Sequence, residues 1–420
     1  MLSLEKLVEM NHWWKLGQVK EIFVPSFKRS LFYEIQKYAR LRHIIAVIGL
    51  RRVGKTTLLY QTIREFIGNK VDPRHILYFS FDEECEEIRD ILKLYHEKIL
   101  GKTLGEEKIY VFLDEIQKLK DWQNKIKVLY DLYPTIKFLI SGSASLNILL
   151  KAKESLAGRI FYLYADLLSF HEFLELKGKE KFKQNPDLWK EDLKIELNNY
   201  LFRPFPEIVN ADDDLTKKYI REGSIEKAIF RDLTSLFEIK DVELIEKLVH
   251  LLAANPGMIV NLDDLSKDFN RSRQVISNYL YYLECCFLVK GLRNFRGSLK
   301  SSSRKLKRYY LLHPALGISL EFPDIGRSIE NLVMFKTKAD YFWREKEKEV
   351  DFVVSEKRVI RPVESKYTNN IREKDIKGLL KFMDLFGIKE GLVITEGLEK
   401  EEVMGGVKIK YIPLWKWLLS

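Results

Sequence analysis

The sequence predicts an α/β protein of several parts, the first of which is a parallel sheet covered by helices. Short apolar runs alternate with helical patterns through residues 1–165, and such runs are typical of strands that are buried on both faces. A helical stretch follows, and residues 309–420 return to mixed strand and helix patterns. At 420 residues the chain is too long for one ordinary core, so we expect two to four domains.

Five apolar runs are the predicted strands of the first sheet. Because strands that alternate with helices form parallel sheets, we expect all five to run in the same direction. They are HIIAVI (43–48), ILYFSF (76–81), KIYVFLDE (108–115), KFLISGS (137–143) and RIFYLYA (159–165).

Composition and cysteine content indicate a cytoplasmic protein without a membrane partner. Hydrophobic residues make up 46% and charged residues 31% of the chain, and no run approaches the ~20 apolar residues of a membrane span. Glu5 and Glu9 interrupt the N-terminal segment where a signal peptide needs an apolar core. The cysteines, Cys85, Cys285 and Cys286, form no CxxC pair, which argues against a disulfide framework and a structural zinc site.

The positive charge of the chain is concentrated in one segment. The formal net charge is +10, and residues 285–320 contain eight basic residues and no Asp or Glu. Without these eight, the net charge would fall to about +2. We therefore expect a surface patch that binds a polyanion. The eight are Lys290, Arg293, Arg296, Lys300, Arg304, Lys305, Lys307 and Arg308.

A glycine-rich loop follows the first predicted strand and opens a helix. GLRRVGKT (49–56) matches the pattern G-x-x-x-x-G-K-[ST], in which the loop backbone and the helix N-terminus hold phosphates. Lys55 is expected to reach the β- and γ-phosphates, and the Thr56 hydroxyl is expected to bind Mg²⁺. We assign these residues to nucleotide binding: Gly49, Arg52, Gly54, Lys55, Thr56 and Thr57.

Two carboxylates end the third predicted strand, where open α/β sheets bind their ligands. Asp114 suits Mg²⁺, directly or through water, and is also assigned to the nucleotide site. Glu115 suits activation of the attacking water, which would make the domain a hydrolase rather than a passive nucleotide binder. The alternative is that the two carboxylates merely end a strand.

Two further residues are candidate catalytic groups of the same site. Ser141 ends the fourth predicted strand, where it could sense the γ-phosphate, and Arg159 is a candidate transition-state arginine that acts in cis or on a neighbouring subunit. The alternatives are a turn serine and an arginine in a surface ion pair.

These motifs together resemble a known family. GLRRVGKTTLLYQ, FLDEIQ, ISGS, SLAGR and LSFHEFL are similar to the AAA-type P-loop ATPases of archaea and bacteria whose chains carry a C-terminal domain of undefined role. The resemblance implies an ASCE-type sheet with an extra strand between the two nucleotide motifs, ATP as the nucleotide, and a helical lid over residues 166–236.

Residues 237–308 have the pattern of a winged helix-turn-helix. One helix ends at NPG (255–257), a second begins near residues 262–265 with Asp263 or Asp264 as its cap, and a third covers residues 274–284. A protein-docking module or a spacer is the alternative to DNA binding. The predicted base contacts are Arg273, Gln274, Ser277 and Asn278, and the predicted phosphate contacts on the wing are Arg293, Arg296, Lys300, Arg304 and Lys305.

Acidic residues and one lysine recur through residues 309–420. Glu330 lies on a predicted helix, Asp351 shares a strand face with Glu349, and Glu364 shares a face of the next strand with Lys366. Phosphodiester cleavage needs carboxylates to hold Mg²⁺ and a lysine to orient or deprotonate water. The alternative is a salt bridge between Glu364 and Lys366 on an exposed face.

This set resembles the PD-(D/E)xK nuclease superfamily, which has a restriction-endonuclease-like α/β fold. The resemblance implies catalytic roles for Glu330, Asp351, Glu364 and Lys366, with Asp351 and Glu364 as ligands of Mg²⁺ or Mn²⁺. A degenerate member could keep the fold for DNA binding alone.

The predicted organisation is a P-loop ATPase core (1–165), a helical lid (166–236), a winged helix-turn-helix (237–308) and a nuclease-like domain (309–420). The favoured hypothesis is an ATPase that binds DNA and cleaves it under control of the nucleotide state. The alternative is an ATP-driven switch for DNA or protein whose nuclease-like domain is silent. Both hypotheses are compatible with a homo-oligomer and with an unidentified protein partner.

Overall fold

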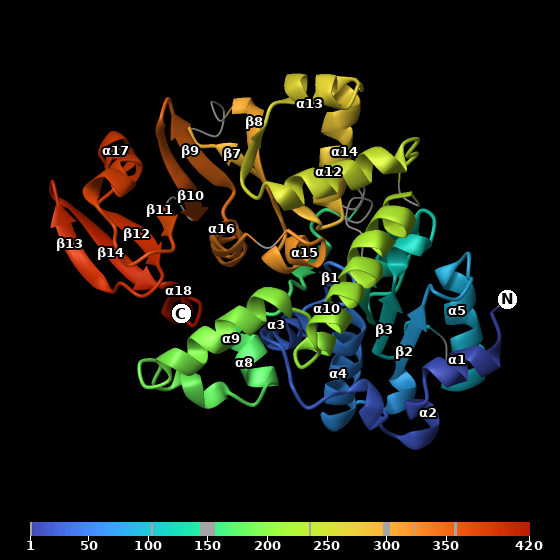
Figure 1. The fold of residues 1–420 in the computed structure, drawn as a ribbon. Helices are drawn as coiled ribbons and strands as arrows, with labels where there is room; N and C mark the ends of the chain where they lie inside the picture. Colours follow the sequence, from blue (N-terminus) through green and yellow to red (C-terminus); the bar gives the residue numbers. More distant parts are fainter. Residues whose placement is uncertain are drawn as a thin grey trace. The chain divides into compact units, whose positions relative to one another are not determined.

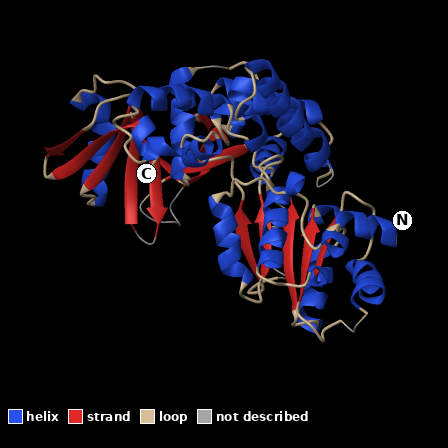
Figure 2. Ribbon diagram, turned by 90° about the horizontal axis from the view of Figure 1, so that it is seen from below, coloured by secondary structure: helices blue, strands red, loops and turns tan. Residues whose placement is uncertain are grey.

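The computed structural model describes residues 2–101, 104–142, 156–234, 237–296, 303–322, 324–356 and 359–420, with the backbone alone at 303–305. The chain divides into two compact units. The first consists of Met1–Asp166 with Ser235–Phe237, and the second consists of Leu167–Thr234 with Glu238–Ser420. Figure 1 follows the chain through both units in sequence colours, and Figure 2 distinguishes their helices and strands.

The first unit contains a five-stranded sheet in the order β2-β3-β4-β1-β5, in which every pair is parallel, as predicted. β4 lies between β1 and β3, so an extra strand separates the two strands that carry the nucleotide motifs. Its strands are β1 (Ile44–Ile48), β2 (Ile76–Ser80), β3 (Ile109–Asp114), β4 (Ile136–Gly142) and β5 (Ile160–Tyr164).

The burial of these strands follows their position in the sheet. Every residue of β1 and β4 is buried, as expected for central strands in an α/β sheet. The prediction that RIFYLYA is buried on both faces is wrong, because β5 is an edge strand in which only Leu163 is buried. The predicted strand 137–143 ends at Gly142, and residue 143 lies outside the described residues.

Helices surround this sheet, as Figure 2 shows. α3 contacts β1 and β5, α4 contacts β4, and α1 contacts β2. The helices are α1 (Leu4–Met10), α2 (Trp13–Leu16), α3 (Ser30–Ala39), α4 (Lys55–Gly68), α5 (Ile88–Tyr95) and α6 (Trp122–Leu132). Single turns of 3₁₀ or π helix lie at Glu21–Phe23, Pro73–His75, His96–Leu100 and Ile116–Lys118.

The segment predicted as the helical lid packs in the second unit, where α9 and α10 contact α15 (Pro314–Ser319), and α9 contacts α18 (Leu414–Trp417). A capping box of Ser169 and Glu172 starts α8. The segment contains α8 (Phe170–Leu176), α9 (Lys190–Phe202), α10 (Asp213–Ile220), 3₁₀ turns at Glu180–Lys183 and Pro206–Ile208, and π-helical segments at Arg221–Glu226 and Ala228–Leu233.

Four helices and three strands follow within the described part of residues 237–319. β8 pairs in antiparallel fashion with both β6 and β7. The predicted cap of the second helix is wrong, because the Asn261 side chain accepts from the Asp263 backbone N–H and caps α13. The elements are α12 (Val242–Ala254), β6 (Met258–Val260), α13 (Leu262–Asp268), α14 (Arg273–Cys285), β7 (Val289–Asn294), β8 (Ser303–Leu311) and α15 (Pro314–Ser319).

The remaining strands extend the same sheet, whose order is β13-β14-β12-β11-β10-β9-β7-β8-β6. The parallel pair β7 and β9 joins its two parts, and the expected boundary between residues 308 and 309 falls inside β8. The elements are α16 (Ile325–Thr337), β9 (Tyr341–Glu345), β10 (Lys348–Glu356), β11 (Val359–Lys366), a 3₁₀ turn at Glu373–Ile376, α17 (Lys377–Phe386), β12 (Glu390–Thr395), β13 (Lys400–Met404), β14 (Val407–Pro413) and α18 (Leu414–Trp417).

No helix within the described parts of the chain combines the length and the apolar character that crossing a bilayer requires.

Candidate functional site

The predicted phosphate loop connects β1 to the N-terminus of α4. Two of its residues have positive φ, Arg52 at 65° and Gly54 at 89°, a conformation that is costly for residues other than glycine. Gly54 precedes Lys55, the first residue of α4, and Thr57 lies in the first turn. The loop therefore ends where the backbone N–H groups of a helix N-terminus are available to an anion.

Gly49 has a role in packing that the motif alone does not indicate. A Cβ at this position would overlap the carbonyl oxygen of Ala165, which follows β5. The Ala165 N–H donates to the Ile48 carbonyl over 2.8 Å. A glycine is therefore required at residue 49 because the end of β5 passes directly against the start of the loop.

Lys55 and Thr56 fix the loop in different ways. The Lys55 ammonium is buried and donates to the carbonyl oxygens of Leu50 at 2.9 Å and Gly49 at 3.2 Å. The Thr56 hydroxyl donates to Oδ2 of Asp114 over 2.6 Å. The loop and the end of β3 are thus joined directly, as the paired motifs predict.

Asp114 is the centre of this site and is only 2% exposed. Besides Thr56, it accepts hydrogen bonds from the Tyr78 hydroxyl at 3.0 Å, from the backbone N–H of Glu115 at 3.0 Å, and from the Ser141 hydroxyl. The structure therefore brings Thr56, Asp114 and Ser141 together. Their oxygens are the hard ligands that Mg²⁺ prefers, so the residues present fit this metal.

Tyr78 is a member of the site that sequence analysis missed. It lies on β2, and burial together with the negative charge of Asp114 raises the pKa of its hydroxyl well above the usual value. It therefore serves Asp114 as a hydrogen-bond donor. The available signal was a tyrosine within the predicted strand ILYFSF, two residues before β2 ends at Ser80.

Glu115 has an unusual backbone for a glutamate, with φ at 51°. Its carboxylate accepts a hydrogen bond from Gln117 Nε2 over 2.5 Å. Left-handed conformations at residues other than glycine are strained and cluster at functional sites. The conformation turns the chain immediately after Asp114, so the two adjacent carboxylates take separate positions.

Arg159 does not lie at the phosphate loop. It immediately precedes β5, which runs parallel to β1 with Ile160 opposite Ile44. Arg159 therefore lies at the N-terminal end of these parallel strands. The phosphate loop follows the other end of β1. Arg159 Nε pairs with Asp131 over 3.0 Å. The prediction that Arg159 acts in cis is therefore wrong, and a role on a neighbouring subunit stays a prediction.

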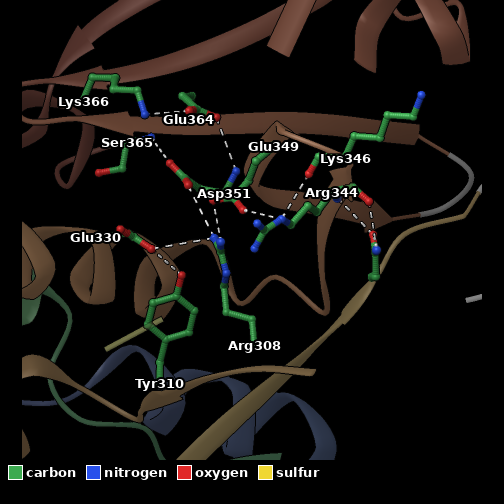
Figure 3. Close-up of polar contacts among 11 residues, drawn as sticks. Arg308, Tyr310, Glu330, Arg344, Lys346, Glu349, Asp351, Glu364, Ser365 and Lys366 are labelled. Atoms are coloured by element: carbon green, nitrogen blue, oxygen red, sulfur yellow. Dashed lines mark hydrogen bonds and ion pairs between the residues drawn. The ribbon is translucent and has the colours of Figure 1, made fainter. Parts of the chain in front are cut away.

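A second polar site lies in the second unit, where four carboxylates gather (Figure 3). We call Glu330, Glu349, Asp351 and Glu364 the acid cluster. Glu330 comes from α16, Glu349 and Asp351 from β10, and Glu364 from β11. The backbone N–H of Asp351 donates to Glu364 Oε2 at 3.3 Å, and that of Ser365 donates to Asp351 Oδ2 at 2.9 Å.

Lys366 pairs with Glu364 over 2.7 Å, and this ion pair is not an exposed one because Glu364 is only 5% exposed. Burial and the charge of Asp351 raise the pKa of Glu364 to about 8. Burial and the same charge raise the pKa of Glu330 to about 7. Burial disfavours the ammonium form of Lys366, yet the charges of Glu364 and Asp351 raise its pKa above the ordinary value.

Two residues that sequence analysis did not assign to this site reach it from β8. Arg308 is 5% exposed, and its Nη2 lies 2.5 Å from Glu349. The Tyr310 hydroxyl donates to Glu330 over 2.5 Å. Figure 3 shows the Arg308 guanidinium directed at the acid cluster. The spacing of two residues on one strand places both side chains on the same face.

The predicted basic patch is therefore smaller than its sequence suggested. Lys290 pairs with Asp340 at 2.7 Å, Lys307 pairs with Glu284 at 3.1 Å, and Arg308 is buried in the acid cluster. The prediction that the eight basic residues lack acidic partners is wrong for these three, because strands and helices distant in sequence bring the acids to them.

The predicted base contacts lie on α14. Arg273 and Gln274 are exposed, while Ser277 and Asn278 are half-buried. Arg273 pairs with Asp263 over 2.9 Å, and Gln274 donates to Asn278 over 2.8 Å. Their spacing along the helix places them on neighbouring positions of its surface.

The predicted wing contacts lie on and after β7. Arg293 is exposed and stacks on the Tyr341 ring at 5.0 Å, and Arg296 is exposed. Lys300 lies outside the described residues, as do the side chains of Arg304 and Lys305.

The chemistry of the acid cluster limits the metal that it could take. Within the ranges that the structure describes, no group of three or more His, Cys, Asp or Glu residues is arranged to hold a metal ion. Mg²⁺ is bound by one or two carboxylates and keeps several waters. Asp351 and Glu364 therefore fit this ion better than one that needs a full set of side-chain ligands.

The five-stranded sheet and the phosphate loop together define the first unit as a P-loop nucleotide-binding domain of the α/β class. Comparison with protein families agrees, because residues 41–174 match a family model described as "AAA domain". The AAA-type domain implies a nucleotide and Mg²⁺. Residues 196–325 match "Domain of unknown function (DUF8612)", and residues 326–417 match "Domain of unknown function (DUF4143)".

The chain is also similar to several uncharacterised proteins over most of its length. Two are from Methanocaldococcus jannaschii, one 29% identical over 90% of this chain and 88% of the relative, the other 28% identical over 90% and 85%. A third, from Haemophilus influenzae, is 25% identical over 89% and 94%. A solved structure described as "Structure of C. elegans PCH-2" aligns with 44% of this chain and 48% of that chain at 13% identity and a TM-score of 0.24, which is too low to support an argument.

Proposed function

We propose that this protein is an ATP-hydrolysing P-loop ATPase that binds DNA and cleaves it at a Mg²⁺-dependent nuclease site under control of the nucleotide state. The AAA domain supports the ATPase. One observation supports the nuclease: Glu330, Asp351, Glu364 and Lys366, which come from one helix and two strands, lie in one cluster of polar side chains (Figure 3).

For ATP hydrolysis, the roles follow from the contacts at the phosphate loop. Lys55, which donates to the loop carbonyls, would contact the β- and γ-phosphates of a bound nucleotide. Thr56 and Asp114 would hold Mg²⁺, which would supply neutralisation of the phosphate charge. Glu115 accepts a proton from the attacking water. Ser141, which already bonds Asp114, senses the γ-phosphate.

Arg159 has a role in this hypothesis only if it acts across a subunit boundary. Its side chain pairs with Asp131 at the opposite end of the strands from the phosphate loop. A transition-state arginine must contact the transferring phosphate. Catalysis by Arg159 therefore requires a homo-oligomer in which it reaches a neighbour's nucleotide.

For DNA binding, residues 237–308 supply a winged-helix arrangement. The order α12, β6, α13, α14, β7 and β8, with β8 paired to both β6 and β7, supports this interpretation. α14 would enter the major groove with Arg273 and Gln274, and Arg293 and Arg296 would contact phosphates. The same roles are proposed for Ser277, Asn278, Lys300, Arg304 and Lys305.

For cleavage, residues 309–420 supply a nuclease-like arrangement. β10 and β11 are antiparallel neighbours, and β12 is parallel to β11. Asp351 and Glu364 would hold Mg²⁺, with Mn²⁺ as a substitute, and Lys366 would orient or deprotonate the attacking water. Glu330 would complete the acidic set from α16. This organisation resembles the PD-(D/E)xK superfamily.

A cleavage assay tests the proposal. Linear, circular and branched DNA are incubated with the protein and Mg²⁺ or Mn²⁺, with and without ATP. We expect Lys366→Ala to abolish cutting while ATP hydrolysis continues, and Lys55→Ala to abolish hydrolysis and the effect of ATP on cutting. Glu115→Gln should abolish hydrolysis but keep ATP binding.

Controls make the assay specific. Lys381→Ala removes a lysine of the same region that pairs with Glu345 at the surface, and it should leave cutting unchanged. Cutting that persists in Lys366→Ala would remove this lysine from the mechanism. Hydrolysis that is unaffected by Glu115→Gln would show that another group activates water.

A second candidate function is favoured by one observation. Arg308 already places a positive charge among the carboxylates, as in a site that has lost its metal. In that case the protein is an ATP-driven switch that docks DNA or a protein partner, and no DNA substrate is cut under any condition of the assay.

A further inference from the structure

The Arg308 guanidinium has two close contacts in the acid cluster, with Glu349 and with the Phe342 ring, while its Nη1 atom has no close partner within the described part of the chain. Nη2 pairs with Glu349 over 2.5 Å, and the guanidinium lies 5.0 Å from the centre of the Phe342 ring. Nη1 lies 3.5 Å from Asp351 Oδ1 and 3.9 Å from Glu330 Oε1. Nη1 therefore lies between two carboxylates without a hydrogen bond to either one.

The hydrogen bonding of Arg308 is incomplete although its side chain is buried. Among the described residues, neither Nε nor Nη1 has a hydrogen-bond partner. A buried guanidinium with a purely structural role normally uses its N–H groups fully, because each unpaired one is costly. Apart from the contact of Nη2 with Glu349, the position of Arg308 is thus determined by charge rather than by complementary hydrogen bonds.

The neighbours of Nη1 decide which kind of ligand this site favours. They are the carboxylates of Asp351 and Glu330, so a phosphate at the same point would be repelled. A divalent cation would be attracted, because it would neutralise both carboxylates with more charge than the guanidinium provides.

We propose that Arg308 is the resident counter-ion of the acid cluster and competes with a divalent cation for Asp351 and Glu330. The inference rests on the proposed nuclease site and adds a residue that regulates metal binding there. Arg308 stabilises the cluster while no metal is bound, and it lowers the affinity for the metal because the guanidinium must give way when the metal enters.

Arginine suits this role better than lysine. The guanidinium is weakly hydrated and stacks on aromatic rings, so it loses less solvation on burial than an ammonium does. The Phe342 ring provides such a surface. Because Arg308 belongs to β8, which also pairs with β6 and β7, metal entry and the position of β8 are coupled, and the coupling acts in both directions.

Mn²⁺ binding to the full chain without nucleotide tests the inference. Free Mn²⁺ is measured by electron paramagnetic resonance during titration of wild type, Arg308→Gln, Arg344→Gln and Asp351→Asn. We expect Arg308→Gln to bind Mn²⁺ more tightly by on the order of tenfold. The gain should disappear in the double variant Arg308→Gln with Asp351→Asn, which assigns it to the acid cluster.

Arg344→Gln is the matched control. Arg344 is exposed, and its Nε donates to the Lys346 carbonyl at 3.4 Å and lies 3.9 Å from Glu349, so its loss should change Mn²⁺ affinity by less than about twofold. Arg308→Lys keeps the charge and should stay closer to wild type than Arg308→Gln does. An affinity for Arg308→Lys as tight as that of Arg308→Gln would overturn a role that depends on charge.

A measurement on the wild type covers the case in which Arg308→Gln does not fold. Saturating Mn²⁺ should increase amide hydrogen exchange in residues 306–311 of β8, because the side chain that anchors this strand is displaced. Mn²⁺ binding without any change in exchange there would overturn the inference.

The failure of the inference and the failure of the nuclease proposal give different results. If wild type binds Mn²⁺ through Asp351 and Arg308→Gln binds it no more tightly, Arg308 is not a competing counter-ion, and the metal site stands. If neither protein binds Mn²⁺, both proposals fail. If only Arg308→Gln binds Mn²⁺, Arg308 prevents metal binding in the wild type, and the inference is supported.

Discussion

At the scale of the residue, the nucleotide site depends on how many donors converge on one carboxylate. Asp114 is buried and accepts hydrogen bonds from Thr56, Tyr78, Ser141 and the backbone of Glu115. Such a carboxylate keeps its orientation because several donors already direct its lone pairs. Mg²⁺ would therefore meet a ligand that needs little rearrangement.

Replacement of Gly49 tests the close approach of loop and sheet. Gly49→Ala places a Cβ against the Ala165 carbonyl, so we expect a loss of about 1–3 kcal/mol in the free energy of unfolding. Denaturant titration of the variant measures the loss. Gly68→Ala is the matched control, since a Cβ at this helical position meets nothing within 4 Å, and it should be neutral or stabilising by up to about 1 kcal/mol. Equal effects would contradict the packing argument.

His313 gives a prediction on pH. It is fully buried, caps α15 by accepting from the Ala315 N–H, and burial lowers its pKa to about 3. The unfolded chain, with a pKa near 6.5, then binds more protons than the folded protein as pH falls from about 6.5 toward 3. Stability contributed by neutral His313 is therefore lost across this window.

His313→Asn should reduce this pH dependence, because asparagine can also cap a helix but does not titrate. Thermal unfolding followed between pH 7 and 4.5 should show a shallower decrease in stability for the variant than for wild type. His250→Asn is the control, since His250 is exposed, and it should keep the wild-type slope. A wild-type slope in His313→Asn would refute the assignment.

The residues that sequence analysis could predict are those whose neighbours are set by local pattern. Thr56 and Asp114 belong to motifs at the ends of strands, and the ends of parallel strands meet at one edge of the sheet. The roles of Tyr78 and Arg308 depend on which strands lie side by side. The order of strands in a sheet is not specified by the spacing or composition of the segments that form them. Arg308 was also hidden among basic residues, where the simplest interpretation was a surface patch.

At the scale of the element, strands were predicted more reliably than their environments. The apolar runs locate β1 to β5, but only the strand order shows that β5 is at an edge and partly exposed. A similar limit applies to the helical segment of residues 167–234, which packs in the second unit. Periodicity identifies a helix and its apolar face, but not which partner covers that face.

Substitution of two residues on α14 tests the proposed DNA interface. Arg273 is exposed and pairs with Asp263 at the surface, so its removal should leave folding intact. We expect Arg273→Ala with Gln274→Ala to weaken binding of duplex DNA by about tenfold, as loss of a good base contact costs roughly 1–3 kcal/mol. Fluorescence anisotropy at fixed salt measures this.

The control for this double substitution is replacement of an exposed basic residue on another helix. Lys218 lies on α10 and is exposed, and Lys218→Ala removes the same charge from the chain. Its affinity for DNA should remain near that of wild type. Equal loss in both variants would indicate a response to net charge alone, without an interface on α14.

At the scale of the whole molecule, each unit has its own sheet and core. The first unit matches the AAA domain over much of its length. In the second, one nine-stranded sheet contains both the strands β6 to β8 and the strands that carry the acid cluster. β7 and β8, which form the proposed wing, are therefore in one sheet with the strands that carry Glu349, Asp351 and Glu364, and we expect these strands to unfold together.

Fragments of the chain test that expectation. A fragment of residues 309–420 cuts β8 after Arg308 and removes β7, which pairs with β9, so it should lack a cooperative unfolding transition. A fragment of residues 167–420 keeps the second unit whole and should unfold in one transition. Circular dichroism during thermal unfolding distinguishes them, and a cooperative transition in the shorter fragment would contradict the expectation.

The ion pairs of Arg308 also affect how the protein can change over evolutionary time. The matched families divide the chain between residues 325 and 326, which assigns Arg308 to one family and Asp351 and Glu349 to the other. A substitution at Arg308 leaves the buried carboxylate of Asp351 and the half-buried carboxylate of Glu349 without their cation, so its cost depends on what occupies residues 349 and 351. We expect these positions to vary together among relatives, a correlation that emerges only when the two segments are aligned as one chain.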